Sequence, residues 1–175
     1  MITEIFTQHF RTTYGELIIG DYHNQICLCD WRYRKSREAI DDRIQVGLSA
    51  YYTEESTPLI DKTIKQLNEF FTRKRFEFDI PILFVGTDFQ QKVWQELMKI
   101  PYGETTTYLD IAERIREPQA FRAVANANGA NAISIIVPCH RVIGKSNKFK
   151  LAGYAGGVNV KERLLKLESG QLFSG

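Results

Sequence analysis

A thiol, an imidazole and a guanidinium stand side by side in this sequence, as Cys139, His140 and Arg141. The apolar run 135–137 precedes them, and Pro138 separates that run from the cysteine. The thiolate is the reactive form of cysteine, and neighbouring cations lower the thiol pKa below its usual value near 8.5. The segment therefore predicts an activated thiolate at the end of a buried strand.

The other two cysteines, Cys27 and Cys29, alternate with apolar residues and are typical of small buried residues in a strand. A competing interpretation is a zinc site built from these two thiols together with His9 and His23. The Cys-x-Cys spacing departs from the Cys-x2-Cys spacing of zinc knuckles, which weighs against that site. We expect no metal at Cys139, because no companion ligands accompany it.

The segment 120–132, AFRAVANANGANA, is rich in Ala, Asn and Gly. Small side chains such as Ala123, Ala127 and Ala130 allow another surface to approach a helix closely. That surface is either a packed helix or the minor groove of a nucleic acid, where Asn side chains and helix amides contact phosphates. Arg122 is the long cation of this segment, and its guanidinium could insert among bases by stacking.

Elements in the second half of the chain must position these residues. Thr87 and Gln90 fit a capping box at the start of a helix that carries Phe89, Val93, Trp94 and Leu97. A second helix is expected near Thr107 with Asp110 in the capping position, and a third after Pro118. Their short connection around residues 116–117 predicts a helix-turn-helix. Residues 133–137 predict a short apolar strand or an extended segment, and a last helix after Asn159 is expected to bury Leu164, Leu165 and Leu167.

The first half reads as strands with one clear helix. Residues 33–43 are rich in charge and are expected to be solvated. The apolar spacing of Ile60, Ile64, Leu67 and Phe71 predicts an amphipathic helix from Ser56. The expected strands are 6–10, 17–21, 26–31 and the alternating segment at 76–80, followed by a connector at 83–86.

Composition sets only broad limits. The 175 residues are 43% hydrophobic and 25% charged, which is ordinary for a globular protein. The net charge of +2 neither requires nor excludes a nucleic acid partner. We find no signal peptide, no membrane-spanning run and an odd number of cysteines, and we therefore expect a cytoplasmic protein with reduced thiols.

Three motifs in order, IPYGETTTYLDIA, PCHRVIG and YAGGVNVKERLLKLE, resemble the O6-alkylguanine-DNA alkyltransferases, also called methylated-DNA–protein-cysteine methyltransferases. The resemblance covers residues 84–168. It implies an α+β fold with a small ribonuclease-H-like sheet-plus-helix domain at 1–83. It also implies a mostly helical domain at 84–175 that carries a winged helix-turn-helix and the active site.

The resemblance also implies roles for individual residues. Cys139 would accept the alkyl group, and His140 would take the thiol proton through a water molecule. Glu168 would orient that histidine, Asn131 would brace the active-site turn, and Tyr108 would donate a hydrogen bond to the everted guanine.

Further residues would contact DNA or line the pocket. The backbone carbonyls of Cys139 and Val142 would accept from the exocyclic amine of guanine. The chain departs from some family members at Ala155, where they carry Ser, and at Ser134, where they carry Pro. The implied DNA-binding residues are Arg122, Ala123, Ala127, Asn128 and Tyr108, and the pocket residues are Val142, Tyr154, Ala155, Gly156 and Gly157.

The implied reaction is a one-time, irreversible transfer of an alkyl group from O6-alkylguanine in DNA to Cys139, with O4-alkylthymine as a further candidate substrate. No cofactor is needed, and the implied partner is double-stranded DNA bound by a monomer through its minor groove, with no membrane. The alternatives are a helix-turn-helix regulator with an inert buried thiol and a Cys-His hydrolase that turns over. An alkyltransferase-like protein that only binds lesions would lack the cysteine.

Overall fold

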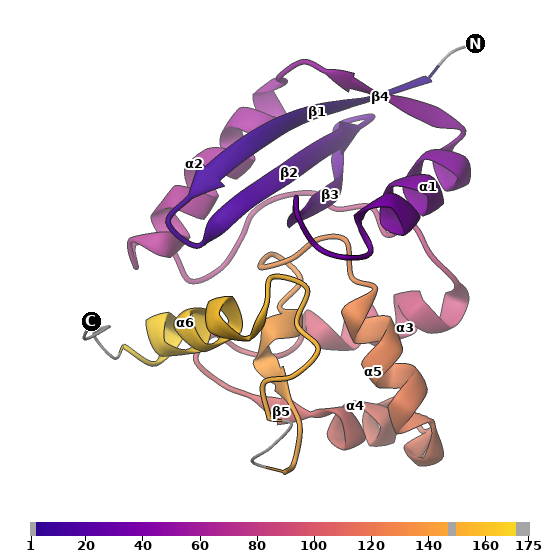
Figure 1. Cartoon of the computed structure of the whole chain (residues 1–175), viewed down its shortest axis with the longest axis vertical. Coiled ribbons are helices and arrows are strands. Elements are labelled where there is room, and N and C mark those ends of the chain that lie inside the picture. Colours follow the sequence, from indigo (N-terminus) through magenta and orange to yellow (C-terminus); the bar gives the residue numbers. More distant parts are fainter. Residues whose placement is uncertain (1–2, 147–149, 171–175) are drawn as a thin grey trace. The chain divides into compact units, whose positions relative to one another are not determined.

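The computed structural model describes residues 3–146 and 150–170 (Figure 1). The chain divides into two compact units, Met1–Gly86 and Thr87–Gly175. The boundary expected between residues 83 and 84 lies three residues before this division. None of the helices in the described part of the chain is long and apolar enough to cross a membrane.

The first unit is built on a four-stranded sheet. Its strands are β1 Thr3–Thr12, β2 Gly15–Tyr22, β3 Gln25–Trp31 and β4 Ala50–Glu54, in the order β3-β2-β1-β4. β2 pairs with β1 and β3 in antiparallel fashion, and β4 joins β1 in parallel. His23 and Asn24 form the tight turn between β2 and β3 with φ of 50° and 64°. The three expected N-terminal strands are therefore confirmed, whereas β4 was not foreseen.

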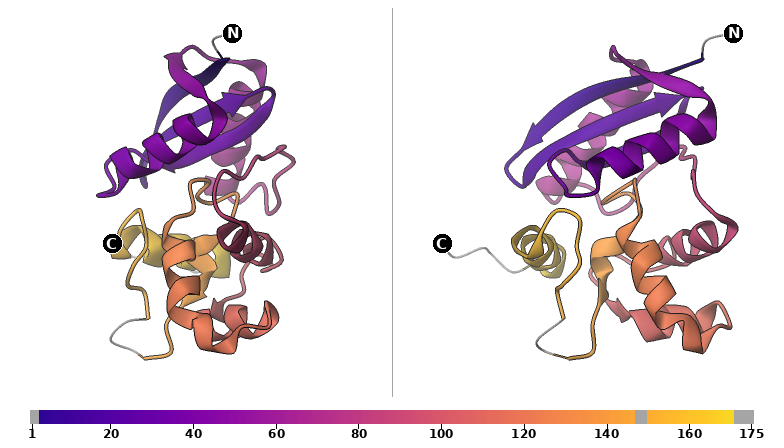
Figure 2. Two further views of the ribbon diagram at one scale, coloured as in Figure 1. Left: turned by 90° about the vertical axis from the view of Figure 1, so that its right-hand side faces the viewer. Right: turned by 45° about the vertical axis from the view of Figure 1, so that its right-hand side comes forward.

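Two helices accompany this sheet, α1 Arg37–Leu48 and α2 Pro58–Phe71. Figures 1 and 2 show α2 behind the sheet and α1 in front of it. The solvated stretch expected at 33–43 is wrong in part. Asp30 is fully buried, and Arg34 and Arg37 pair with it at 3.1 and 3.0 Å. A buried carboxylate that holds two arginines explains why a charged segment lies against the unit.

Two other expectations for this unit also need correction. Residues 76–80 form no strand; instead the chain reaches the sheet later, through a bridge between Ile82 and Ile26. Thr57 caps α2 by accepting from the Ile60 amide at 3.1 Å. The helix buries Phe70 rather than the expected Phe71, one position along the helical turn.

The second unit is mostly helical. Thr87 and Gln90 form the expected capping box at the start of the first helix. Thr107 caps the second, and Asp110 is its partner in that box rather than the cap. The indole nitrogen of Trp94 donates to the Ala127 carbonyl at 2.8 Å and so ties two helices together. The elements are α3 Asp88–Leu97, β5 Thr106–Thr107, α4 Tyr108–Arg114, the 3-10 turn η1 Pro118–Ala120, α5 Phe121–Gly129, the 3-10 turn η2 Cys139–Arg141, β6 Val142–Ile143 and α6 Val158–Ser169.

Two sequence-based elements of this unit are wrong in detail. Residues 133–137 form tight turns rather than a strand. α6 begins two residues before the expected start after Asn159. Its buried positions are Lys161, Leu164 and Glu168, while Leu165 and Leu167 are half-buried.

Candidate active site

The backbone before Cys139 is folded by two successive three-residue turns. The Ile136 amide donates to the Ser134 carbonyl at 2.8 Å around Ile135, whose φ is 72°. The Cys139 amide donates to the Val137 carbonyl at 2.8 Å around Pro138, whose φ and ψ are −81° and 63°. The second is the common inverse γ-turn, and the first has the rarer, strained sense.

Ile135 is the strained residue of this segment. A β-branched side chain rarely adopts left-handed φ, and such a conformation costs about 1–3 kcal/mol. Ile135 is 1% exposed, so burial of its side chain holds the conformation in place. The surrounding fold therefore imposes the shape of the turn that leads to the cysteine.

Asn131 braces the same turn from within. Its amide nitrogen donates to the carbonyls of Val137 at 3.0 Å and Ile133 at 3.4 Å, and its oxygen accepts from the Ile133 amide at 2.9 Å. Asn131 is 1% exposed, so these bonds replace those that water would make. This geometry agrees with the bracing role expected for Asn131.

Cys139 is the first residue of η2 and is 3% exposed. The cysteine therefore lies inside the fold of this unit rather than on its surface. The Asn128 side chain donates to the Cys139 carbonyl at 3.4 Å, which places α5 beside the cysteine.

His140, Arg141 and Glu168 form a buried ionic network. The His140 Nε2 lies 2.6 Å from the Glu168 Oε2. Arg141 donates to both oxygens of the same carboxylate, through Nε at 2.8 Å and Nη2 at 3.0 Å. Its Nη1 donates to the Ile100 carbonyl at 2.7 Å. Arg141 therefore binds Glu168, a contact that the sequence did not predict.

The ionisation of this network follows from its contacts. Burial alone would raise the pKa of Glu168, but the hydrogen bonds from His140 and Arg141 and the charge of Arg141 outweigh it and hold that pKa well below its usual value. Burial lowers the pKa of His140, although Glu168 opposes the shift. We assign a neutral imidazole whose Nε2 proton is donated to Glu168. The buried Nδ1, which has no hydrogen-bond partner among the described residues, is then left to accept a proton.

Lys161 is a site residue that the sequence interpretation missed. It is fully buried, and its Nζ donates to the Val142 carbonyl at 2.6 Å. Burial lowers the pKa of Lys161 to about 8, and a negative charge on Cys139 acts in the opposite direction. Lys161 precedes Glu168 by seven residues, which is two helical turns and the same face. That spacing was the available signal.

Tyr108 is placed next to the cysteine segment by a short parallel ladder. Thr106 pairs with Val142, and Thr107 pairs with Ile143. Tyr108 follows β5 directly. Burial raises the pKa of Tyr108, and the charge of a Cys139 thiolate raises it further. The phenol therefore stays protonated at neutral pH and is available as a donor.

The expected pocket residues lie around His140 and the start of α6. Tyr154 is buried, with its ring centroid 6.5 Å from that of His140 in an edge-on arrangement. Ala155 and Gly156 are half-buried, and Gly157 is the N-cap residue before α6 with φ of 94°, which suits a residue without a side chain. The Val142 carbonyl already accepts from Lys161, so a guanine amine would have to use its second lone pair.

The expected DNA-binding residues of α5 separate into two groups. Arg122 and Ala123 are exposed, so they remain candidates for contact with DNA. Ala127 and Asn128 are 2% and 4% exposed, and they pack inside the unit. The Ala127 carbonyl accepts from Trp94 and the Asn128 side chain donates to the cysteine turn, so contact of these two residues with DNA stays a prediction.

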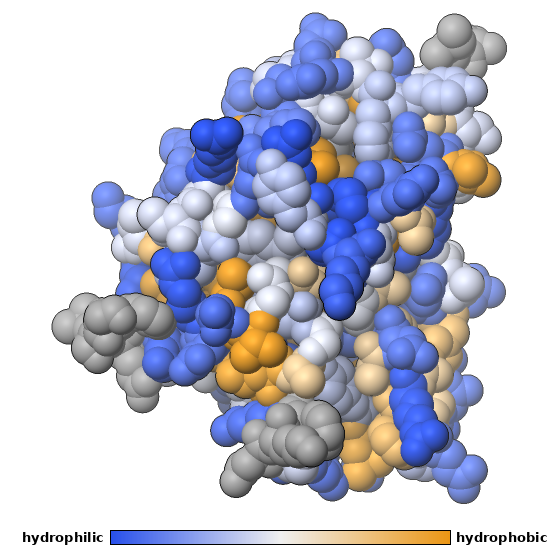
Figure 3. Space-filling model, in the orientation of Figure 1, coloured by the Kyte–Doolittle hydropathy of each residue, from blue (hydrophilic) through white to orange (hydrophobic). Residues whose placement is uncertain are grey.

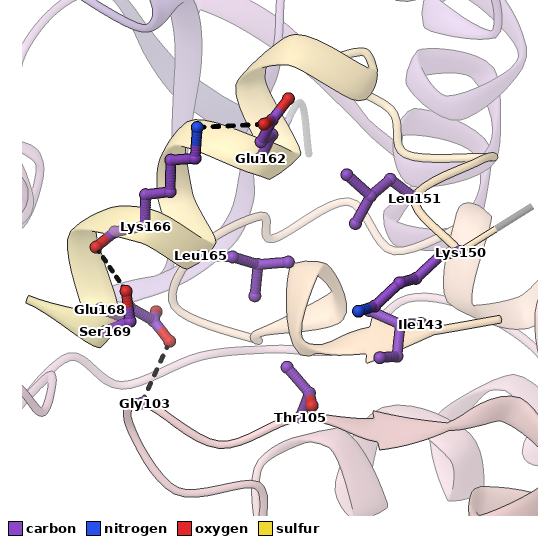
Figure 4. A pocket seen from close by; sticks show the side chains of 10 residues that line it. All are labelled: Gly103, Thr105, Ile143, Lys150, Leu151, Glu162, Leu165, Lys166, Glu168 and Ser169. Carbon is purple, nitrogen blue, oxygen red and sulfur yellow. Dashed lines mark hydrogen bonds and ion pairs between the residues drawn. The ribbon is translucent and has the colours of Figure 1, made fainter. Parts of the chain in front are cut away.

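A cavity of about 320 Å³ lies against Glu168 between α6 and the strands β5 and β6 (Figure 4). Figure 4 shows Leu165 and Thr105 pointing into this space, with Glu168 at its edge. The Gly103 amide donates to Glu168 Oε1 at 3.3 Å. Gly103 has φ of 82°, which favours glycine in this close approach.

The zinc alternative receives no geometric support. Within residues 3–146 and 150–170, no three His, Cys, Asp or Glu side chains lie together in a way that could hold a metal ion. Burial raises the pKa of Cys27 to about 12 and that of Cys29 still higher, so neither is a ready thiolate ligand.

Comparison with known sequences points to one family. A family model described as "6-O-methylguanine DNA methyltransferase, DNA binding domain" matches residues 88–170. A Mycobacterium tuberculosis methylated-DNA–protein-cysteine methyltransferase is 56% identical over 105 residues, which cover 60% of this chain and 62% of that protein. A constitutive Bacillus subtilis protein of the same name is 42% identical over 159 residues, which cover 90% of this chain and 92% of its own.

Solved structures agree with the sequence matches. A crystal structure of the Mycobacterium tuberculosis O6-methylguanine methyltransferase aligns with a TM-score of 0.79 at 35% identity, covering 98% of this chain and 96% of that one. A structure of Mycobacterium tuberculosis OGT in complex with DNA aligns with a TM-score of 0.77 at 37% identity, covering 95% and 93%. The mixed α/β architecture, with a small sheet and a helical unit, is therefore shared with these proteins.

Proposed function

This chain belongs to the family of the methylated-DNA–protein-cysteine methyltransferases, and we propose that it repairs DNA by a single transfer of an alkyl group from guanine O6 to Cys139. The observation that carries the proposal is the buried network of His140, Glu168 and Arg141 directly after Cys139. This network fixes a neutral imidazole, which can act as a base next to the thiol.

The proposed reaction is a displacement at the alkyl carbon. His140 Nδ1 takes the proton of the Cys139 thiol through a water molecule, and the sulfur lone pair forms the new S–C bond. The bond between carbon and guanine O6 breaks, and its electron pair leaves on the guanine. Tyr108 donates a hydrogen bond to this anion, and the proton taken from the thiol returns to the base. The product is a thioether, a very poor leaving group, so the protein acts once and needs no cofactor.

Access to the alkyl group sets the mode of DNA binding. The O6 substituent is unreachable inside a duplex, so the nucleotide must be turned out of the stack. We propose that Arg122 fills the gap it leaves, and that exposed Ala123 allows α5 to approach the minor groove. The lesion enters past Tyr154, Ala155 and Gly156, and the absence of a hydroxyl at Ala155 removes one donor near guanine O6. O4-alkylthymine is a second candidate lesion.

The finer fold assignments belong to the same proposal. We propose that the first unit is a ribonuclease-H-like domain. We also propose that α4 and α5 are the two helices of a winged helix-turn-helix, joined through Arg116 with its left-handed φ of 63°. The protein is expected to act as a monomer. A reduced Cys139 suits the cytoplasm, where thiols are kept reduced.

Intact-protein mass spectrometry tests the transfer. Protein is mixed with an excess of duplex DNA that carries one O6-methylguanine per duplex, and both the protein mass and the amount of demethylated base are measured over time. The expected result is the gain of one methyl group per chain, abolished in Cys139→Ala but retained in Cys27→Ala. An unchanged mass contradicts the proposal and favours a regulator with an inert thiol. More than one demethylated base per protein favours a hydrolase-type enzyme.

A further inference from the structure

We propose that Phe121 is a second DNA-reading side chain, which stacks on the base that adjoins the everted nucleotide in the lesion-bearing strand. The inference rests on the proposed function and adds a contact to it. Phe121 borders an apolar hollow between α4 and the end of β6, which we call the Phe121 hollow. It has a volume of about 360 Å³ and is lined by Thr107, Tyr108, Leu109, Phe121, Gly144 and Lys145.

The position of the Phe121 hollow follows from the β5–β6 register. Thr107 pairs with Ile143, so Tyr108 and Gly144, the next residue in each segment, also come together. Tyr108 is the side chain assigned to the everted guanine, and it also lines the hollow. A nucleotide held in the hollow would therefore be a neighbour of the everted one along the same strand.

Phe121 lies outside the buried face of α5. It is 45% exposed, whereas the helix buries Val124, Ala127 and Asn128. Its ring lies under the Arg122 guanidinium, with 5.9 Å between the guanidinium carbon and the ring centroid. Hydrophobic atoms gather at the lower right of Figure 3, over the region that α4 and α5 occupy in Figure 1. An exposed aromatic ring beside the proposed finger is well placed to meet a base.

The charges around the Phe121 hollow select its occupant. Arg122 and Lys145 are exposed, and neither forms an ion pair with another described residue. A nucleotide offers an aromatic face to the ring and a phosphate to the cations, which is how proteins hold unpaired strands. A purely apolar ligand would use the ring and leave both cations without a partner. We therefore assign the hollow to a segment of the DNA strand.

Binding measurements on the full chain test the stacking. The Cys139→Ala protein is titrated with O6-methylguanine duplex, with and without Phe121→Leu, which keeps apolar area but removes the aromatic face. Phe76→Leu is the matched control, because Phe76 is 50% exposed in the first unit. Phe121→Leu should weaken binding roughly tenfold with an unchanged salt slope, since stacking is worth about 1–3 kcal/mol per base. Lys145→Ala should reduce the salt slope by about one phosphate contact.

A fluorescent base gives a second readout. With 2-aminopurine next to the lesion, the bound protein should quench its fluorescence, and Phe121→Leu should remove that quenching. Equal fluorescence or equal affinity for both proteins overturns the inference. A third measurement uses proteins that keep Cys139. The rate at which free O6-methylguanine methylates Cys139 should be the same in Phe121→Leu and in the wild-type protein. If Phe121→Leu slows methylation by the free base as much as it weakens DNA binding, the inference is also overturned, because Phe121 would then shape the guanine pocket. If the wild-type protein gains no methyl group from DNA, the proposed function is refuted instead.

Discussion

Lys161→Met is the most informative single change in the candidate active site. Lys161 is fully buried, and burial lowers its pKa from 10.5 to about 8. Below pH 8 the folded protein therefore keeps an ammonium that the fold disfavours. The lowering corresponds to a cost of about 3 kcal/mol at pH 7, at roughly 1.4 kcal/mol for each tenfold change in proton affinity.

The sign of the pH dependence follows from the same shift. The folded pKa lies below the unfolded one, so the cost is fully present below the folded pKa and disappears as the pH rises towards the unfolded pKa. At pH 9.5 the cost falls to about 1 kcal/mol. The wild-type protein thus gains about 2 kcal/mol through this group between pH 7 and pH 9.5, a gain that Lys161→Met lacks.

The variant also loses the bond from Lys161 to the Val142 carbonyl, and an unsatisfied buried carbonyl costs about 1–3 kcal/mol. We therefore expect Lys161→Met to be more stable than wild type by about 1 kcal/mol at pH 7 and less stable at pH 9.5. Single-turnover methyl transfer should be slower at neutral pH, because the variant lacks the positive charge that favours the Cys139 thiolate.

Urea unfolding followed by tryptophan fluorescence measures both free energies. Lys166→Met is the matched control, since Lys166 lies on the same helix with its side chain 39% exposed. Its stability difference from wild type should not change with pH. If the difference between Lys161→Met and wild type is also constant from pH 7 to pH 9.5, the buried ammonium and the reasoning built on it are refuted.

Three further changes test the rest of the site. Glu168→Gln should destabilise the protein by about 3 kcal/mol at pH 7, because it leaves buried Arg141 without its carboxylate. Since the folded pKa of Glu168 is lowered to about 2, its stabilisation is present above the unfolded pKa and is lost on acidification; the difference measured by urea unfolding should therefore shrink between pH 5 and pH 2. Tyr108→Phe should slow single-turnover transfer by about a hundredfold and change the unfolding free energy by less than about 0.5 kcal/mol; unchanged kinetics would contradict the donor role. Arg122→Ala should slow transfer from duplex DNA more than transfer from free O6-methylguanine, and equal losses would argue against the finger.

Local signals in the sequence predicted local structure well. The Thr87 and Gln90 capping box holds in the structure because both of its bonds lie within one helical turn. The strands β1, β2 and β3 were also predicted, since short apolar runs are separated there by turn residues. The charged stretch at 33–43 misled because its burial depends on Asp30, a residue in another element, and no local pattern reports such a pairing.

Around the candidate site, polar and charged residues occupy buried positions that the hydrophobic pattern assigned to apolar residues. Leucine spacing in α6 predicted Leu165 and Leu167 as core, but Lys161 and Glu168 occupy the buried positions. Residues 133–137 are apolar enough for a strand, yet Asn131 supplies the hydrogen bonds that would otherwise come from a neighbouring strand. Such conflicts between local pattern and fold are typical of functional sites.

The ladder between β5 and β6 contains only two residue pairs, Thr106 with Val142 and Thr107 with Ile143. These pairs hold the segment that leads to Tyr108 beside the segment that follows the thiol. The described residues 150–157 form no pair of this ladder, so we expect insertions or substitutions there to leave that arrangement unchanged. Evolution or protein engineering could therefore reshape the segment past which the lesion enters, to admit larger alkyl groups, while the Tyr108 phenol and the Cys139 thiol keep their separation.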